Sequence, residues 1–519
     1  MNKIKKCLWI LLTILVTTAA GCAPQTSEQT TSSLSETTAG AAPENSRNTN
    51  LSSESDETTI ENRRAGTTNK FSLGVTLDVT AHKLTVNQNL TYHNNTGMDL
   101  ENIYFNLIPQ AFRENGGGIN IIEISVNSQA CSLEQVDGTV YSLSLPASLP
   151  AGKQIDIRMN YEVYIPNIQN RFGYQENVFN LGNFIITPAV YGQNGWTIEP
   201  YVDIGDAFYT DIADYNVTIN VPEDNIVAAT GRKIGSNSYH AENVRDFAFC
   251  ASNSFQTLSD TWKNTAITVY YGDNMTATAE RALDTARKSL ELFSNKFGTY
   301  PYSDLNIVMS GLTGGVNGME YPQLIMISPQ ISLESMADMG VDISDQKETE
   351  PYMVDFDNSV CHEIAHQWFY GIVGNDQITF PWLDEGFCRY CEYLYQKKYP
   401  PMVSEDDGIY LMEDRLNDFY IRVSGKGGEA GTGYAPDTTD LKLTLYDWEQ
   451  QDPMGYSEIY DKGASLIYKI EQEIGEGASD RAVKEYVQRF AYGFVTAEDF
   501  KAFWNEKGDL SELLTMYLE

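Results

Sequence analysis

A five-residue pattern, H-E-x-x-H at positions 362–366, constrains this chain more than any other feature. In an α-helix, side chains four positions apart lie on one face, so both imidazoles of the pattern can reach a single ion. The chain holds only 5 His, and this stretch contains two of them. Asp355 and Asp357 predict where the helix starts, and apolar neighbours such as Trp368 predict that it is mostly buried. Because two buried imidazoles need polar partners, the pattern predicts a metal-binding helix.

Catalytic zinc sites need a third protein ligand and keep a fourth position open. The candidate is Glu385, 19 positions after His366, inside the apolar stretch W-L-D-E-G-F at 382–387. An unpaired carboxylate would be costly there, so it needs a cationic partner. We therefore expect one Zn²⁺ per chain, held by His362, His366 and Glu385. The alternatives, two polar residues on an exposed helix face and a surface acid, fit the apolar surroundings poorly.

Length and charge limit the remaining possibilities. At 519 residues the chain is long enough for two or three domains. Its formal net charge is -36, so its surface repels phosphates and releases no counterions from them, which argues against nucleic acid as a partner. Solubility outside the cell is the simpler explanation of this charge, and attraction of basic peptides is the other.

The first residues have the pattern of a processed leader. Lysines at positions 3, 5 and 6 precede a mostly apolar stretch, residues 7–16, which is too short to be a convincing membrane span. The sequence A-A-G-C that ends at Cys22 resembles the lipobox of bacterial lipoproteins, although Ala19 stands where Leu is usual. The resemblance implies a signal peptide over residues 1–21, acylation of Cys22, and a location at the cell membrane, outside the cytoplasm. An ordinary secretory signal with a chance Cys is the alternative.

Composition divides the rest of the chain into three parts. Residues 22–68 are rich in Ser, Thr, Glu and Asn, which predicts a disordered tether. Residues 69–264 contain short segments of period two, such as 84–92, which predict an all-β domain. Residues 265–519 begin with strands and a helix and become mostly helical after Phe356, which predicts a mixed α+β domain.

The metal motif extends into a longer pattern that resembles a known family. His362 to Phe369 and the stretch 382–387 are similar to H-E-x-x-H-x-W-F and W-L-N-E-G-F of the M1 (aminopeptidase N-like) zinc peptidases, members of the gluzincin group. Asp384 stands where the family has Asn, and Tyr370 stands where it usually has Gly. Neither difference removes a predicted metal ligand.

Two further stretches resemble the same family, one on each side of the metal motif. Residues 318–321, G-M-E-Y, resemble its G-A-M-E-N loop, and residues 460–463, Y-D-K-G, resemble its Y-x-K-G. In the first stretch the small residue between Gly and Met is absent, and Tyr321 stands where Asn is usual. The Met-Glu pair is intact, so the role of this loop is retained.

The resemblance implies a multidomain fold. It implies a saddle-like, all-β N-terminal domain over residues 69–264, followed by a thermolysin-like α+β domain over 265–519. The second domain should be mostly helical after the zinc helix and should end in a short helical C-terminus.

The resemblance also implies a role for each matching side chain. Glu363 would act as the general base on the attacking water. Tyr460 would donate a hydrogen bond to the oxyanion of the tetrahedral intermediate, and nearby Tyr456 competes for this role. Glu320 would pair with the free α-amine of a substrate, with Gly318 and Met319 beside it in the substrate-binding loop.

Three functions remain open after these inferences. The first is a zinc-dependent aminopeptidase that removes N-terminal residues from peptides and is held at the membrane by a lipid anchor. The second is a related zinc endopeptidase. The third is a non-catalytic, peptide-binding lipoprotein on the same scaffold, which fits less well because every predicted ligand and catalytic residue is present.

Overall fold

The computed structural model describes residues 67–312, 316–404, 407–425 and 437–519. The predicted signal peptide, the lipidation site Cys22 and the tether as far as residue 66 lie outside these ranges. Within these ranges, no helix is both long enough and apolar enough to cross a membrane.

The N-terminal domain is built around an eight-stranded sheet with the order β16-β17-β14-β1-β2-β8-β4-β5. At its centre, β1 (Asn69–Asp78) runs parallel to β14 (Ala213–Asn220) and antiparallel to β2 (Lys83–His93), which pairs in turn with β8 (Gln154–Tyr164). Buried and exposed side chains alternate along β2, because successive side chains of a strand point to opposite faces. The prediction of an all-β domain is therefore confirmed.

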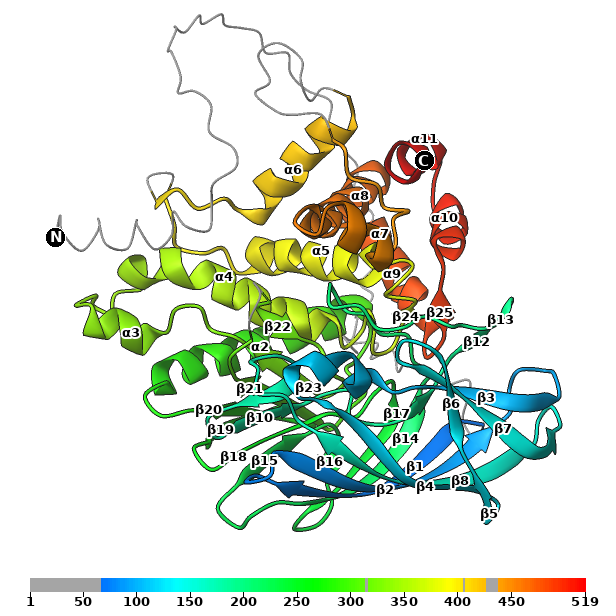
Figure 1. Cartoon of the computed structure of the whole chain (residues 1–519). Helices are drawn as coiled ribbons and strands as arrows, with labels where there is room; N and C mark the ends of the chain where they lie inside the picture. The colour runs from blue at the N-terminus through cyan, green and yellow to red at the C-terminus, as the bar shows by residue number, and fades with distance from the viewer. Residues whose placement is uncertain (1–66, 313–315, 405–406, 426–436) are drawn as a thin grey trace, which may run out of the picture.

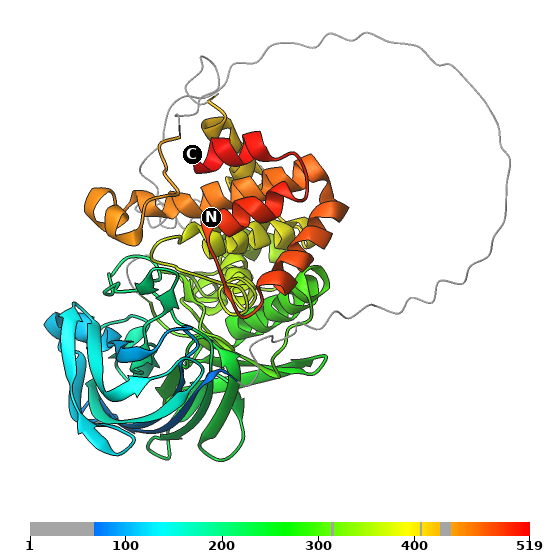
Figure 2. The same cartoon turned by 90° about the vertical axis from the view of Figure 1, so that its right-hand side faces the viewer.

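Smaller sheets and hairpins complete this domain. Its other elements are β3 (Leu100–Asn106), η1 (Ile108–Asn115), β4 (Gly118–Val126), β5 (Gln129–Cys131), β6 (Leu133–Asp137), β7 (Val140–Leu149), β9 (Phe172–Gln175), β10 (Val178–Leu181), β11 (Thr187–Pro188), β12 (Tyr191–Gly192), β13 (Gly195–Trp196), β15 (Ile226–Ala229), β16 (Arg232–Lys233), β17 (Ser238–Val244) and β18 (Phe249–Ser252). Figures 1 and 2 show these strands on one side of the molecule and the helices on the other.

The C-terminal domain begins with a five-stranded sheet of order β19-β20-β21-β23-β22. The predicted domain boundary after residue 264 falls inside the hairpin of β19 (Gln256–Trp262) and β20 (Thr265–Tyr271). Strand β19 has the same two-residue period as the N-terminal strands, so its pattern alone could not assign it to this sheet. The remaining strands are β21 (Asp304–Met309), β22 (Gly318–Met319), β23 (Leu324–Ile327), β24 (Gly374–Asn375) and β25 (Phe494–Val495).

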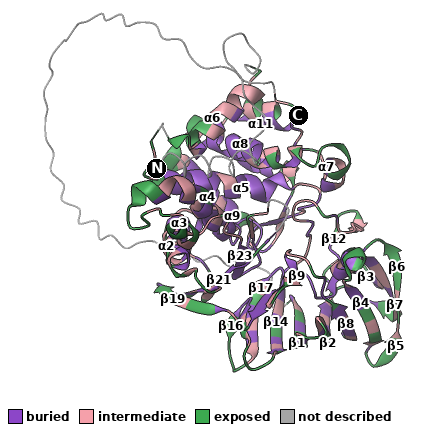
Figure 3. Cartoon of the chain, turned by 60° about the vertical axis from the view of Figure 1, so that its left-hand side comes forward, coloured by how far each residue is buried: buried purple, intermediate pink, exposed green. Residues whose placement is uncertain are grey.

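Helices form the rest of this domain, as predicted. They are α2 (Thr276–Phe297), α3 (Leu333–Asp338), α4 (Gln346–Ala365), α5 (Trp382–Lys398), α6 (Met412–Val423), α7 (Leu445–Gln451), η3 (Gly455–Ser457), α8 (Glu458–Ile474), α9 (Glu476–Phe490), α10 (Ala497–Asn505) and α11 (Ser511–Leu518). Figure 3 shows that α5 and α8 are largely buried at the centre of this body.

The metal-motif helix α4 starts earlier than predicted. Asp345 is its N-cap and accepts a hydrogen bond from the backbone nitrogen of Lys347 at 3.0 Å. Asp357, one of the two residues that predict the start, instead pairs with Arg281 of α2 at 2.6 Å. The acidic side chain therefore joins two helices instead of capping one.

Two glycines let α5 and α8 approach closely. A Cβ built on Gly463 would lie 2.9 Å from the Cα of Gly386, and a Cβ on Gly386 would lie 2.9 Å from the backbone of Gly463. Any side chain at either position would force the helices apart. This contact brings Tyr460, which lies three residues before Gly463 on α8, close to the metal-motif helix.

The two domains are joined by buried contacts. The guanidinium of Arg245, between β17 and β18, donates hydrogen bonds to the carbonyl of Tyr370 at 2.5 Å and to that of Gly493 at 2.6 Å. A small apolar cluster also spans the boundary and contains Met319 and Tyr321 beside Cys250 of the N-terminal domain. The turn after the metal motif and the loop around residue 320 are therefore fixed partly by the N-terminal domain.

Candidate metal centre

The predicted ligands converge on one point. His362 lies in the last turn of α4, His366 directly follows the helix, and Glu385 lies in the first turn of α5. The Oε2 atom of Glu385 is 3.0 Å from Nε2 of His362 and 3.5 Å from Nε2 of His366. Ligands of a tetrahedral zinc ion lie roughly 3.3 Å apart. The three side chains therefore have the chemistry and the spacing of a zinc site.

The other nitrogen of each imidazole is held in place. Nδ1 of His362 donates to Oε1 of Glu392 at 2.8 Å, and Nδ1 of His366 donates to the carbonyl of Phe369 at 3.0 Å. In the neutral imidazoles that bind a metal, these bonds leave both Nε2 atoms as the electron-pair donors. Glu392 was not predicted from the sequence, although it lies on the same face of α5 as Glu385, two turns further along.

Charge is balanced inside this cluster. Burial disfavours a charged imidazole, but the hydrogen bonds to Glu385 and Glu392 raise the pKa of His362 to about 9. Burial would also raise the pKa of Glu385, yet the hydrogen bonds to His362 and His366 hold it well below its usual range. The carboxylate of Glu385 is thus kept ionised and available as a ligand.

Glu363 has the position expected of a general base. It is 6% exposed, and its Oε2 atom has no hydrogen-bond partner among the described residues. Burial, opposed by the positive charge of His362, raises the pKa of Glu363 to about 8. A Cβ built on Gly318 would lie 2.2 Å from Oε1 of Glu363, so only glycine leaves room for this carboxylate.

Glu320 lies near the metal ligands and is held by an amide. The Nε2 group of Gln377 donates to Oε1 of Glu320 at 3.1 Å and to Oδ2 of Asp384 at 2.7 Å. Burial, then the negative charge of Asp206, raises the pKa of Glu320 to about 7. Glu320, His366 and Asp384 also lie close enough together to suggest a second metal site. Because the amide of Gln377 already donates to both carboxylates, this second group does not need an ion.

Both candidate tyrosines lie beside the metal ligands. The ring of Tyr460 stacks 6.0 Å from that of His362, and burial and then the charge of Glu385 raise the pKa of Tyr460 well above its ordinary value. Tyr456 contacts the Tyr460 ring at 5.8 Å, and its hydroxyl lies where a side chain on Gly205 would be. Tyr460 therefore has the more direct contact with the ligand set.

The N-terminal domain supplies charged residues that sequence reasoning missed. Arg171 is 7% exposed, forms an ion pair with Asp206, and donates to the carbonyl of Gly205 at 3.0 Å. The negative charge of Asp206 acts on Glu320 and on Glu385. No local pattern marks these residues, because they lie far from the metal motif along the chain.

Two predicted substrate-binding residues have different surroundings. The backbone of Gly318 faces Glu363, as described above. Met319 is 1% exposed and packs in the apolar cluster between the domains. The side chain of Met319 therefore anchors the loop around residue 320 in the apolar cluster.

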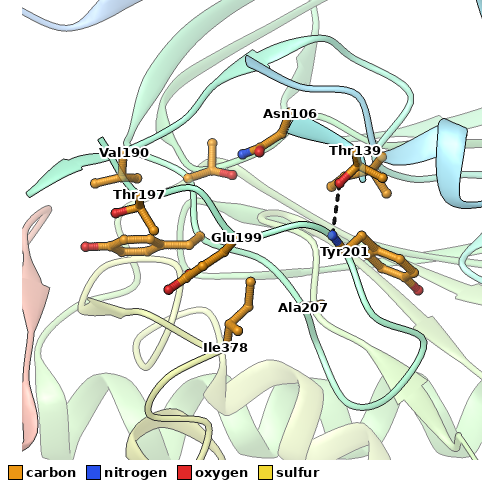
Figure 4. A pocket seen from close by; sticks show the side chains of 11 residues that line it. Asn106, Thr139, Val190, Thr197, Glu199, Tyr201, Ala207 and Ile378 are labelled. Carbon is orange, nitrogen blue, oxygen red and sulfur yellow. Dashed lines mark hydrogen bonds between the residues drawn. The ribbon is translucent and has the colours of Figure 1, made fainter. Parts of the chain in front are cut away.

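A small cavity lies behind the loop that carries Gln377 (Figure 4). Ile378 lines it together with residues of the N-terminal domain, among them Glu199 and Ala207. The backbone nitrogen of Tyr201 donates to Oγ1 of Thr139 at 2.9 Å across its edge. The cavity marks the junction where the N-terminal domain supports the loop before α5.

Comparison with known proteins identifies a related family. Residues 281–517 match the Peptidase family M1 domain. The chain is 25% identical over 265 residues to Aminopeptidase M1-B of Oryza sativa subsp. japonica, which covers 50% of this chain and 27% of that protein. It is 28% identical over 148 residues to Aminopeptidase N of Haemonchus contortus, covering 28% and 14% respectively. The aligned region thus spans about a quarter or less of these relatives.

Solved structures resemble the chain over most of its length. An M1 zinc metallopeptidase from Deinococcus radiodurans has a TM-score of 0.59 at 16% identity, covering 87% of this chain and 94% of that one. A variant of an M1 zinc metallopeptidase from the same organism, bound to a Tyr-Ser-Ala substrate, has a TM-score of 0.56 at 17% identity, with coverages of 87% and 93%. At this identity the likeness concerns the fold, and it confirms the predicted succession of a β domain and a helical catalytic domain. Residues 281–517 are thus similar to the Peptidase family M1 domain, and the chain as a whole has the fold of the M1 zinc metallopeptidase structures.

Proposed function

We propose that this protein is a zinc-dependent aminopeptidase. The observation that carries the proposal is the position of Glu320, a buried carboxylate that lies close to the ligand His366. A buried carboxylate needs a cation, and the N-terminal ammonium group of a peptide supplies one. An internal peptide bond has no such cation, so this arrangement favours cleavage at a free N-terminus.

Zinc is the metal that the donor set fits best. Two imidazole nitrogens and one carboxylate oxygen, with a fourth position left open, are typical of catalytic zinc sites. The buried, unpaired Oε2 atom of Glu363, the residue after His362, supports this assignment, because it needs a partner that a bound metal and its water would supply. A zinc ion bound there polarises the scissile carbonyl and makes the attacking water more acidic.

The protein side chains then have distinct tasks. Glu363 takes a proton from the attacking water and passes it to the leaving amine. Tyr460 donates a hydrogen bond to the developing oxyanion, and its raised pKa keeps that proton in place. Glu320, held by Gln377, pairs with the substrate ammonium group and sets the distance from the chain end to the bond that is cut.

The decisive experiment combines metal analysis with matched peptides. We expect close to one zinc ion per chain and faster cleavage of free peptides than of their N-acetylated copies. In Glu320→Ala this preference should disappear while the zinc content stays the same. Equal cleavage of free and acetylated peptides by the wild-type protein would indicate an endopeptidase, and absence of zinc would refute the proposal.

We also propose that the protein is a lipoprotein held at the membrane, outside the cytoplasm. The support is the leader and the A-A-G-C stretch that ends at Cys22. A fatty-acid analogue fed to producing cells should label the full chain but not Cys22→Ser. Labelling of the variant, or none of the wild type, would contradict this proposal.

A further inference from the structure

Arg389 of α5 contacts groups that belong to two separate parts of the site. Its Nη1 group donates to both carboxylate oxygens of Glu392, at 3.0 Å and 2.9 Å. The centre of its guanidinium lies 5.6 Å from the ring centroid of Tyr460. Its Nε atom lies 3.4 Å from Oδ1 of Asp461, the residue after Tyr460. One cation thus touches the orienting partner of a metal ligand and the catalytic tyrosine.

The contact of Arg389 with Glu392 is linked to the predicted metal ligand His362. Glu392 is 1% exposed and accepts the Nδ1 proton of His362 at 2.8 Å. A buried carboxylate keeps its charge and its place only when it is paired. Without Arg389, the pairing of Glu392 would depend on His362 alone, and the imidazole would lose part of what orients it.

The second contact of Arg389 is with the ring of Tyr460, the proposed oxyanion donor. A guanidinium over an aromatic face is attracted to the ring and restricts its position. Asp461 extends this restraint, because its other oxygen accepts a hydrogen bond from Arg415 of α6 at 2.8 Å. Arg389 therefore contacts the ring of Tyr460, while the ion pair between Arg415 and Asp461 fixes the next residue along the chain.

We propose that Arg389 is a positioning residue that couples the zinc ligand His362 to the oxyanion donor Tyr460. It orients the imidazole through Glu392 and the phenol through direct contact with the ring. The kinetic part of this inference rests on the proposed aminopeptidase function, whereas the metal-binding part does not. It predicts that a single substitution at Arg389 weakens both zinc affinity and kcat, whereas Glu392→Gln weakens mainly the first and Tyr460→Phe mainly the second.

The test compares Arg389→Met with Glu392→Gln and Tyr460→Phe in the full chain. Zinc affinity is measured by competition with a chelator, and kcat and KM are measured on an aminoacyl reporter at saturating zinc. Arg389→Met should lose about tenfold to 100-fold in zinc affinity, as found when outer partners of metal ligands are removed. It should also lose about tenfold in kcat at nearly constant KM, because ring position matters only in the transition state. Glu392→Gln should mainly affect zinc, and Tyr460→Phe mainly kcat.

A double variant separates coupling from general damage. In the Tyr460→Phe background, Arg389→Met should cost little further kcat, because the hydrogen bond it positions is already gone. The visible absorption of the cobalt(II)-substituted protein should shift in Arg389→Met, since it reports ligand geometry. Wild-type zinc affinity in Arg389→Met, or a full and additive loss of kcat in the double variant, would overturn the inference.

Arg422 offers a matched control. Its side chain is also 22% exposed, pairs with Glu458 at 2.9 Å and lies 4.5 Å from the ring centroid of Phe419. Its ion pair within the described part of the chain is with Glu458, and not with a predicted metal ligand or Glu392. Arg422→Met should keep zinc affinity and the cobalt spectrum. If it changed them as much as Arg389→Met, the effect would be general destabilisation and the inference would be wrong.

A second variant keeps the test decisive if Arg389→Met does not fold. Arg389→Lys keeps the charge but cannot make the forked contacts of a guanidinium, so it should show smaller losses of both zinc affinity and kcat. Unchanged zinc affinity together with unchanged kcat in Arg389→Lys would overturn the inference. If the wild type binds zinc but cleaves no peptide, the proposed function fails, while chelator competition still tests the link from Arg389 to His362.

Discussion

The site has two halves that are built in different ways. The metal half consists of His362, His366 and Glu385, carried by the end of one helix and the start of the next. The second half, proposed to bind the substrate amine and called the amine half here, consists of Glu320, directly after β22, and Gln377, in the loop before α5. The first half is organised by helix geometry over a short stretch of chain, and the second by contacts between distant segments.

The two halves also treat buried charge differently. In the metal half, the imidazoles hold the pKa of Glu385 well below its usual range despite burial. In the amine half, burial and the charge of Asp206 raise the pKa of Glu320 to about 7. The metal half contains its own cations, whereas the amine half has a carboxylate whose charge would be better balanced by a cation from outside. This difference supports the proposal that the first half binds the metal and the second half binds the substrate amine.

The largest expected effect lies at the base next to the metal half. Glu363→Gln keeps the shape of the side chain but removes its ability to accept a proton, so activity on every peptide should fall by about 10³-fold. Zinc content should be unchanged, as checked by elemental analysis. If Glu320→Gln removed activity on acetylated and free peptides equally, the distinction between the halves would fail.

Tyr460→Phe should have the next largest effect. Loss of one hydrogen bond to the oxyanion should lower kcat by about 10²-fold, with KM nearly unchanged. Tyr456→Phe is the control, because it removes a neighbouring phenol hydroxyl of the same kind while leaving Tyr460 in place. Steady-state kinetics should measure kcat for both variants. A greater loss of kcat in Tyr456→Phe would assign the oxyanion hydrogen bond to Tyr456 instead of Tyr460.

A smaller effect is expected in the amine half itself. Gln377→Met removes the amide that holds Glu320 and leaves two buried carboxylates without their shared donor. The preference for free over acetylated peptides should fall by about tenfold, the value of one hydrogen bond to a charged group. Asn375→Leu is a useful comparison, because Asn375 donates to Asp384, whereas Gln377 donates to both Asp384 and Glu320. An equal loss of preference in both variants would argue against a specific role for Gln377.

The last prediction concerns the pH dependence of stability from the hydrogen bonds between Tyr321, Asn183 and Asp246, next to the amine half. Tyr321 donates a hydrogen bond to Asn183, which in turn donates to Asp246 at 3.0 Å. Burial raises the pKa of Asp246 to about 7, so between about pH 4 and pH 7 the native state holds a proton that the unfolded chain releases. The free energy of unfolding should therefore fall as pH rises through this window, by at most about 1.4 kcal/mol per pH unit from this group.

Asp246→Asn tests this pH dependence. Denaturant unfolding at about pH 5 and about pH 8 should show a smaller difference in stability for the variant than for the wild type. Asp156→Asn, at an exposed carboxylate of the β domain, should leave the difference unchanged. Identical pH profiles for Asp246→Asn and the wild type would show that Asp246 is ionised in the native state throughout.

Much of the metal half could be predicted from the sequence, because its signals are local. Residues four apart on a helix share a face, so His362 and His366 were paired by spacing alone. The apolar context of Glu385 marked it as a carboxylate in need of a partner. The strands of the N-terminal domain were predictable for the same reason, since alternation of period two reports which face of a strand is buried.

The tertiary structure alone decided the rest. Glu392, Gln377 and Asp206 have no local signal, because each acts on a residue from another element or another domain. The contact between Gly386 and Gly463 places Tyr460, and neither glycine indicates its partner. A sequence pattern reports the faces of its own helix or strand. Which faces meet, and how closely, depends on packing over the whole chain, and that packing determines which buried charges are paired in this site.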